Sequence, residues 1–270
     1  MTAPAAPAKP QGRVLIVAGS DSGGGAGIQA DIKTVTALGG YAATAITALT
    51  AQDTHTVHEI VEVPPRFVAR QMAVVREDIG VDAWKSGMLH NVAVMEAVAA
   101  EIAHAPDAPL VCDPVMVAKG GARLLERNAL AALKSLLVKG AALVTPNLPE
   151  AELLVGFAVD SERTQWRAAE ALMKAGAQAA LVKGGHGSGQ EVVDVLMSEA
   201  GEQRFAAPRL TTRNTHGTGC TLASACACGL AQGMPLADAV ARALAYVRTA
   251  METAPGFGSG HSPLNHARHA

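Results

Sequence analysis

The sequence predicts an α/β protein whose central sheet is mainly parallel. Short apolar runs rich in β-branched residues alternate with helical patterns of about ten to fifteen residues, and one late pair of runs resembles an antiparallel hairpin. Strands that alternate with helices form right-handed βαβ units, whose strands are parallel. An antiparallel hairpin often forms the edge of such a sheet, so we expect one at residues 191–197 and 203–208.

The first strand is expected at residues 13–18 and is followed at once by a glycine-rich segment, 19–27, which should form a flexible loop at the active site. A helix should follow at 26–38, and two glycines end it. The glycine segment is not a dinucleotide fingerprint, because no acidic residue lies about 20 positions further on. The chain also lacks the Gly-Lys-Ser/Thr of a Walker A loop.

The alternation continues along the rest of the chain. Further strands are expected at 43–49, 57–63, 83–86, 110–112, 141–144 and 179–182. Further helices are expected at 65–79, 92–103, 129–138, 165–175 and 236–251. A last glycine-rich turn opens into a helix whose apolar face carries Leu222, Ala225, Cys226, Gly229 and Leu230.

That glycine-rich turn, residues 214–221, is central to the functional prediction. The first N–H groups of a helix lack partners and carry the positive end of its dipole, so a glycine turn that opens into a helix can bind an anion. Alternatively, the glycines only permit a tight turn and the cysteine is a small core residue. Cys220 lies in the expected first turn, where the dipole should lower the thiol pKa and favour thiolate, whereas Cys226 and Cys228 should be inert packing residues.

Polar residues at expected strand ends are further candidates, because ligands of open α/β sheets bind beyond the carboxyl ends of the strands. The Gln52 amide suits the edge of a heterocycle, unless it belongs to a solvated turn. Asp113 is a metal or phosphate-side carboxylate or a helix cap. Asn147 and Glu150 either converge on a ligand or form a capping pair. Lys183 enters a glycine turn and can reach a phosphate as a point charge.

Composition excludes several other classes of function. The formal net charge of −2 gives no reason to expect a nucleic-acid or membrane partner, and 3% aromatic residues argue against stacking on single strands. The four cysteines include no CxxC pair, which argues against structural zinc and a disulfide framework and fits a reducing cytoplasm. We expect residues 1–12 to form a disordered Ala/Pro-rich tail. Residues 13–263 should form a single domain, and residues 264–270 a C-terminal tail.

Seven segments together resemble one family. They are GSDSGGGAGIQADIKT (19–34), ITALTAQDT (46–54), KSGML (85–89), DPVM (113–116), TPNLPEA (145–151), VKGGH (182–186) and NTHGTGCT (214–221). They occur in the order found in the bifunctional hydroxymethylpyrimidine and phosphomethylpyrimidine kinases of thiamine biosynthesis. The resemblance implies a ribokinase-like three-layer α/β/α fold, ATP with Mg²⁺, a homodimer, and two successive phosphorylations of one pyrimidine in one site.

The resemblance also implies roles for individual residues. Cys220 would take the proton of the hydroxymethyl group. The other residues are grouped by the ligand that they would contact. The pyrimidine would contact Gln52, Gly19, Asp21 and Met88, and the transferring phosphoryl group would contact Gly217, Thr218 and Gly219. ATP would contact Lys183, Asn147 and Gly185. Mg²⁺ would be held by Asp113 and Glu150.

Two rival functions follow from the same residues. A pyridoxal kinase has a similar pocket, although Gln52 and Cys220 argue against it as the main activity. The second rival is a non-catalytic protein that senses the pyrimidine or a nucleotide. Such a binder need not keep Lys183, Asp113, Glu150 and the anion-binding glycines together, so their joint presence argues against it.

Overall fold

The computed structural model describes residues 9–117, 121, 124–126 and 128–267. The predicted disordered tail, residues 1–12, therefore falls mostly outside the described residues, as do residues 268–270. The strands of the described part are β1 (Arg13–Asp21), β2 (Tyr41–Gln52), β3 (Val57–Glu62), β4 (Ala83–Ser86), β5 (Leu110–Cys112), β6 (Leu143–Val144), β7 (Ala179–Val182), β8 (Glu191–Ser198) and β9 (Gly201–Pro208). The helices are α1 (Gly27–Ala37), α2 (Pro65–Asp78), α3 (Val92–Ile102), α4 (Leu130–Ala132), the π-helix η1 (Leu133–Val138), α5 (Leu148–Val155), α6 (Glu162–Lys174), α7 (Thr218–Ala231) and α8 (Leu236–Glu252).

These strands form one sheet in the order β3-β2-β1-β4-β5-β6-β7-β8-β9. Strands β2, β1, β4, β5, β6 and β7 pair in parallel, so their carboxyl ends share one edge of the sheet. The β8–β9 hairpin joins β7 in antiparallel orientation, which confirms the predicted edge hairpin. At the opposite edge β3 runs antiparallel to β2.

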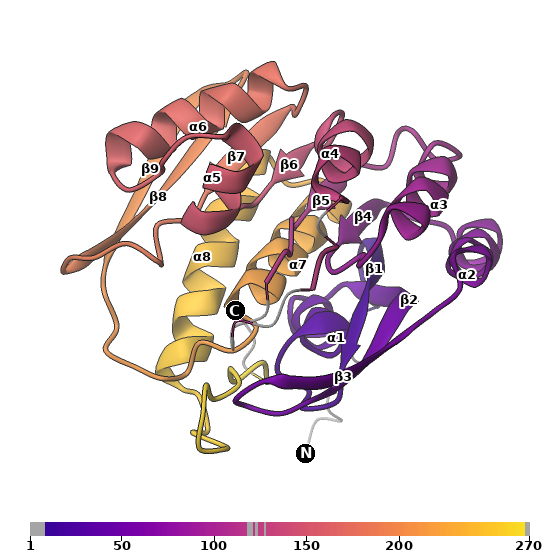
Figure 1. Ribbon diagram of the computed structural model, residues 1–270, viewed down its shortest axis with the longest axis horizontal. Coiled ribbons are helices and arrows are strands. Elements are labelled where there is room, and N and C mark those ends of the chain that lie inside the picture. The colour runs from indigo at the N-terminus through magenta and orange to yellow at the C-terminus, as the bar shows by residue number, and fades with distance from the viewer. Residues whose placement is uncertain (1–8, 118–120, 122–123, 127, 268–270) are drawn as a thin grey trace, which may run out of the picture.

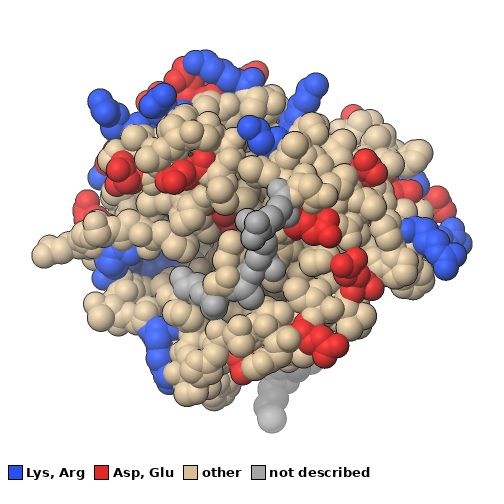
Figure 2. Space-filling view, viewed as in Figure 1, with Lys and Arg blue, Asp and Glu red and all other residues tan. Residues whose placement is uncertain are grey.

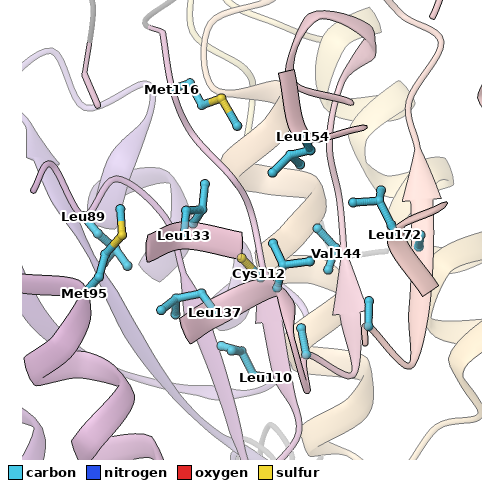
Figure 3. Packing of buried hydrophobic residues seen from close by; sticks show 14 of the residues in the cluster. Leu89, Met95, Leu110, Cys112, Met116, Leu133, Leu137, Val144, Leu154 and Leu172 are labelled. Carbon is cyan, nitrogen blue, oxygen red and sulfur yellow. The ribbon is translucent and has the colours of Figure 1, made fainter. Parts of the chain in front are cut away.

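Helices cover both faces of the sheet, which completes the three predicted layers (Figure 1). On one face, residues of α2, α3, η1, α5 and α6 form a cluster that includes Met95, Leu137 and Leu172, and Figure 3 shows members of it over β5 and β6. On the other face, α1, α7 and α8 contribute Val35, Cys226 and Tyr246 to a second cluster. Full burial of one aliphatic side chain contributes about 1.5–3 kcal/mol, so the two clusters fix both helical layers.

The first strand is longer than the pattern predicted. Ser20 and Asp21 pair with Leu49 and Thr50 of β2, after a register shift that follows Ala18. The predicted flexible loop is therefore reduced to residues 22–26, because backbone pairing with β2 holds its first three residues in the sheet.

Two other segments also depart from the pattern. The helix expected at 129–138 is a short α-helical turn followed by a π-helix, and the N–H of Lys139 donates to the carbonyl of Lys134, five residues back. Apolar periodicity does not distinguish the two helix types. Past residue 263, Leu264 and His266 are buried, and the carbonyl of His266 accepts the Tyr246 hydroxyl at 3.0 Å, so close packing continues to His266.

The surface carries both signs of charge. Figure 2 shows Lys and Arg interspersed with Asp and Glu on one face, with wide areas of other residues between them. This distribution agrees with the formal net charge of −2. No helix in the described ranges is both long enough and apolar enough to cross a membrane.

Candidate active site

One cavity of about 1150 Å³ collects every residue that the sequence analysis assigned to the site. Asp113, Asn147 and Lys183 follow β5, β6 and β7, so the shared carboxyl edge of the sheet brings them to the cavity. The other assigned residues in its lining are Gly19, Asp21, Gln52, Met88, Glu150, Gly185, Gly217, Thr218, Gly219 and Cys220. The predicted meeting place of these segments is therefore observed, while their individual roles stay predictions.

The glycine turn before α7 is held in a conformation that needs glycine. Gly217 has φ +81°, and a Cβ there would lie 1.8 Å from the carbonyl oxygen of Gly25. A Cβ at Gly219 would lie 3.3 Å from Lys183 Nζ and 3.7 Å from Asp113 Oδ2. Because α7 begins at Thr218, the N–H groups of its first turn lie beside a lysine and a carboxylate, which is an arrangement suited to a phosphoryl group.

A Gly217→Ala substitution should therefore lower kcat at least about tenfold if the turn has its predicted role, since it would displace the donors predicted to stabilise a transferring phosphoryl group. Gly233→Ala is the matched control, because Gly233 has φ +78° but a Cβ there would meet no described atom within 4 Å. It should lose about 1–2 kcal/mol of stability through backbone strain while keeping its kcat. Steady-state kinetics with thermal melts of both variants measure the difference; equal kcat values would contradict a special role for the turn.

The prediction of a thiolate-prone Cys220 is wrong. Burial raises the pKa of its thiol to about 12, and although the positive charge of Lys85 lowers this pKa, the charges of Asp31 and Asp113 raise it further. The desolvation cost of the thiolate therefore outweighs the favourable charge of Lys85. Cys226 and Cys228 are fully buried in the second core cluster, as predicted for inert packing residues.

Two carboxylates and a lysine lie together in the site. Lys183 Nζ lies 3.4 Å from Asp113 Oδ1, and the carboxylate of Asp113 is buried. Asp113 Oδ2 has no hydrogen-bond partner among the described residues. Burial raises the pKa of Glu150 to about 7; Lys183 lowers it and Asp113 raises it further. A cation at this place would stabilise both carboxylates.

Asn147 and Glu150 form the capping box that the sequence offered as one alternative. The N–H of Glu150 donates to Asn147 Oδ1 and the N–H of Asn147 donates to Glu150 Oε2, both at 2.9 Å. The cap orients the Glu150 carboxyl group at the start of α5, on the cavity wall. Capping is confirmed, and it is compatible with a second role toward a ligand.

The residues predicted to contact the pyrimidine come from β1, β2 and the segment after β4. A Cβ at Gly19 would lie 3.0 Å from Met88 Sδ, so the glycine makes room for the methionine. Gln52 is half-buried at the end of β2, and its Oε1 accepts the Thr50 hydroxyl at 3.3 Å. The amide NH₂ of Gln52 can then donate to a ligand, as its predicted role requires.

Asp21 lines the cavity, and its carboxylate is held by several hydrogen bonds. Its carboxylate accepts the N–H groups of Gly23, Gly25 and Ala26 at 2.8, 3.0 and 2.7 Å, and Oδ2 lies 2.8 Å from Nε2 of His216. Burial alone would raise the pKa of Asp21, but these hydrogen bonds and the nearby His216 lower it. Asp21 therefore organises the loop at residues 22–26, while its predicted contact with the pyrimidine stays a prediction.

Sequence reasoning missed a buried ion pair behind the site. Lys85 on β4 lies 2.9 Å from Asp31 on α1; both side chains are fully buried, and the Ser224 hydroxyl donates to Asp31 at 2.6 Å. Lys85 also lines the cavity, and a Cβ at Gly87 would lie 2.9 Å from its Nζ. A charged residue in the middle of a predicted buried strand was the available signal, because an unpaired charge is rarely buried.

Comparison with known proteins assigns the chain to a family. A family model described as phosphomethylpyrimidine kinase matches residues 21–265. This chain belongs to that phosphomethylpyrimidine kinase family. The segments that resembled the family in the sequence analysis therefore identified it correctly, and the three-layer fold that they implied is confirmed.

Two relatives and one solved structure illustrate what this family member is similar to. It is 47% identical to the hydroxymethylpyrimidine/phosphomethylpyrimidine kinase of Streptomyces coelicolor, over 98% of both chains. It is 52% identical to the thiamine biosynthesis bifunctional protein ThiED of Geobacter sulfurreducens, of which it covers 52%, about half of that protein's length. The ADP complex of Bacillus subtilis pyridoxal kinase has 32% identity and a TM-score of 0.89, covering 95% of this chain and 98% of that one.

Proposed function

We propose that this chain transfers a phosphoryl group from ATP to the hydroxymethyl oxygen of 4-amino-5-hydroxymethyl-2-methylpyrimidine, and then a second one to the monophosphate. The observation that carries the proposal is a shared cavity whose lining includes Gln52 at the end of β2 and Met88 after β4, and also Lys183, after β7, with Gly219 beside it. The cavity thus offers one surface for a heterocycle and one for phosphates. Relatives named for both reactions match the chain over nearly its whole length.

The chain's own groups divide the reaction between them. Lys183 holds the ATP phosphates, and the N–H groups at the start of α7 stabilise the charge on the transferring phosphoryl group. Gln52 donates its amide to the ring and so orients the hydroxymethyl group toward these donors. The hydroxymethyl oxygen bonds to the γ-phosphorus, the bond to ADP breaks, and the hydroxyl proton passes to the Cys220 thiolate. Because Cys220 lines the cavity, its thiol first releases its own proton to solvent water, and the raised pKa keeps the thiolate fraction small.

The carboxylates fit Mg²⁺ as a partner of ATP. Asp113 Oδ2 is a buried oxygen without a partner among the described residues, and Glu150 is the second carboxylate in the cavity lining. No group of three or more His, Cys, Asp or Glu within the described ranges could hold a metal alone, which agrees with the preference of Mg²⁺ for phosphates and waters plus one or two carboxylates. Bound Mg²⁺ would neutralise phosphate charge.

An Asp113→Asn variant should raise the Mg²⁺ concentration needed for half-maximal activity by about tenfold or more, because the amide removes one anionic oxygen. A Mg²⁺ titration of initial rates at saturating ATP measures this. Asp107→Asn, which changes an exposed carboxylate, is the matched control. An unchanged Mg²⁺ requirement would show that Asp113 is not a ligand.

A second candidate function is pyridoxal phosphorylation, favoured by the similarity to the Bacillus subtilis pyridoxal kinase structure. A comparison of kcat/KM for the pyrimidine with kcat/KM for pyridoxal distinguishes the two functions. We expect the pyrimidine to have the larger value, and Gln52→Leu to lower it by about 10- to 100-fold through the lost amide donor. A larger kcat/KM for pyridoxal, with no effect of Gln52→Leu on the pyrimidine, would reverse the assignment.

We further propose that the protein works as a homodimer in the cytoplasm. Leu49 and Val61 are cross-strand partners on β2 and β3 and are 47% and 54% exposed, an apolar pair that a second copy could cover. The four free cysteines are consistent with a reducing compartment. Light scattering during size-exclusion chromatography tests the dimer: a single monomer mass across concentrations would refute it.

A further inference from the structure

His216 lies inside the anion-binding turn, one residue before Gly217, but its side chain is directed at Asp21 on the neighbouring loop. It is 5% exposed, and its Nε2 lies 2.8 Å from Asp21 Oδ2 across a separation of 195 residues. An ionised carboxylate only accepts hydrogen bonds, so Nε2 carries the proton and donates. The backbone of His216 is also fixed, because its N–H donates to the carbonyl of Ser262 at 3.2 Å.

The two loops that this hydrogen bond joins are in close contact. A Cβ at Gly25 would lie 2.3 Å from Cδ2 of the His216 ring, so the imidazole packs directly on the glycine loop. A Cβ at Gly217 would lie 1.8 Å from the carbonyl oxygen of Gly25. The Asp21 carboxylate in turn accepts three N–H groups of its own loop, including that of Ala26 immediately before α1. The loop at 22–26 and the turn at 216–219 are thus packed as one unit.

We propose that His216 and Asp21 are positioning residues whose hydrogen bond holds the anion-binding N–H groups of the turn at a fixed place relative to the pyrimidine pocket. Both loops line the same cavity, one beside the predicted pyrimidine end and one at the start of α7. The proposal rests on the kinase reaction proposed above. Neither side chain touches the reacting atoms in this role, because the imidazole and carboxylate are directed at each other.

Loss of the hydrogen bond between His216 and Asp21 should have a large effect on turnover. A hydrogen bond to a charged group is stronger than one between neutral groups, and its loss from a buried place leaves the remaining partner without compensation. A displacement of about 1 Å in a positioning group can lower a rate about 100-fold. The donors of the turn act mainly on charge that develops in the transition state, so their displacement should lower kcat more than it raises either KM.

The test compares three substitutions of His216. Glutamine places an amide nitrogen near the position of Nε2 and can donate to Asp21, whereas asparagine is too short and alanine has no donor. We expect kcat to fall about 30- to 100-fold in His216→Ala and His216→Asn, with both KM values within about threefold of wild type. His216→Gln should recover at least about tenfold of that loss. His58→Ala is the matched control, because it removes an exposed His–Asp hydrogen bond of 2.9 Å to Asp53.

Amide hydrogen exchange supplies a readout that does not depend on activity. In His216→Ala the amides of residues 23–26 and 217–219 should both exchange faster, whereas those of β5 and β7 should not change. If His216→Ala does not fold, the comparison of the glutamine and asparagine variants still decides. Equal kcat in those two variants, faster exchange in one loop only, or a change confined to the pyrimidine KM would each overturn the proposal. Loss of the proposed function itself would be seen separately, as a wild-type protein that forms no ADP.

Discussion

The Cys220→Ala variant should lose about 10²- to 10⁴-fold in kcat while keeping its fold, because a positioned general base contributes on that scale. The thiol lies in the first turn of α7 beside the anion-binding glycines, and alanine leaves those N–H groups in place. Substrate binding should therefore change little. Initial rates of ADP release at saturating ATP and pyrimidine, together with circular dichroism, measure the effect.

Cys226→Ala is the matched control for this prediction. Cys226 lies on the same helix, is fully buried and belongs to the core cluster of α1, α7 and α8. Its replacement should cost some stability and leave kcat unchanged. A Cys220→Ala variant with nearly wild-type kcat would exclude the thiol as the proton acceptor and leave the anion-binding turn as the main source of rate enhancement.

The raised pKa of Cys220 should make the wild-type kcat depend on pH. The sign is set by the direction of the shift: with burial raising the pKa to about 12, the thiolate fraction increases as pH rises through the whole range in which the protein is assayed. The wild-type kcat should therefore increase toward alkaline pH, by up to about tenfold per pH unit where proton transfer limits the rate. Cys220→Ala should lack this rise, and an identical pH profile in both proteins would contradict the assignment.

The Lys85→Met variant should lose about 3–5 kcal/mol of unfolding free energy, because it leaves Asp31 as an uncompensated buried charge. Lys85 and Asp31 are both fully buried, so solvent cannot take the place of the missing ammonium group. For a domain of this size the loss corresponds to a fall in Tm of about 6–20 °C. Denaturant titration and thermal melts measure it.

Two further variants show whether the unpaired charge is the cause. Lys85→Met with Asp31→Asn removes both charges and should be less destabilised than Lys85→Met alone. Arg13→Met removes an ion pair to Asp82 whose side chains are 46% and 32% exposed, and it should cost only about 0–1 kcal/mol. Equal losses in the Lys85 and Arg13 variants would contradict the account of the buried pair.

Local patterns predicted most of the fold. The strands at 83–86 and 110–112 agree with β4 and β5 residue for residue, because short strands between helical patterns are predicted from neighbouring positions alone. The capping box at Asn147 and Glu150 was likewise available from a spacing of three residues. The π-helix η1 was missed because a change from four-residue to five-residue bonding leaves the apolar face nearly unaltered.

The remaining features of the site depend on contacts between distant parts of the chain. The pKa of Cys220 follows from burial by the folded protein and from Lys85 and Asp31, which no local pattern brings to it. The hydrogen bond between Asp21 and His216 spans 195 residues. Each residue was visible in the sequence, but their pairing arises only when the sheet places β1 beside the start of α7.

The measurement that tests the central claim most directly is a time course of products from the purified protein with Mg-ATP and 4-amino-5-hydroxymethyl-2-methylpyrimidine, resolved by chromatography. The account predicts that the monophosphate rises and then falls as the diphosphate forms, with one ADP released at each step. Cys220→Ala should slow both steps together, since one site serves both. A monophosphate that accumulates without further conversion, or ADP formation from pyridoxal alone, would contradict the account.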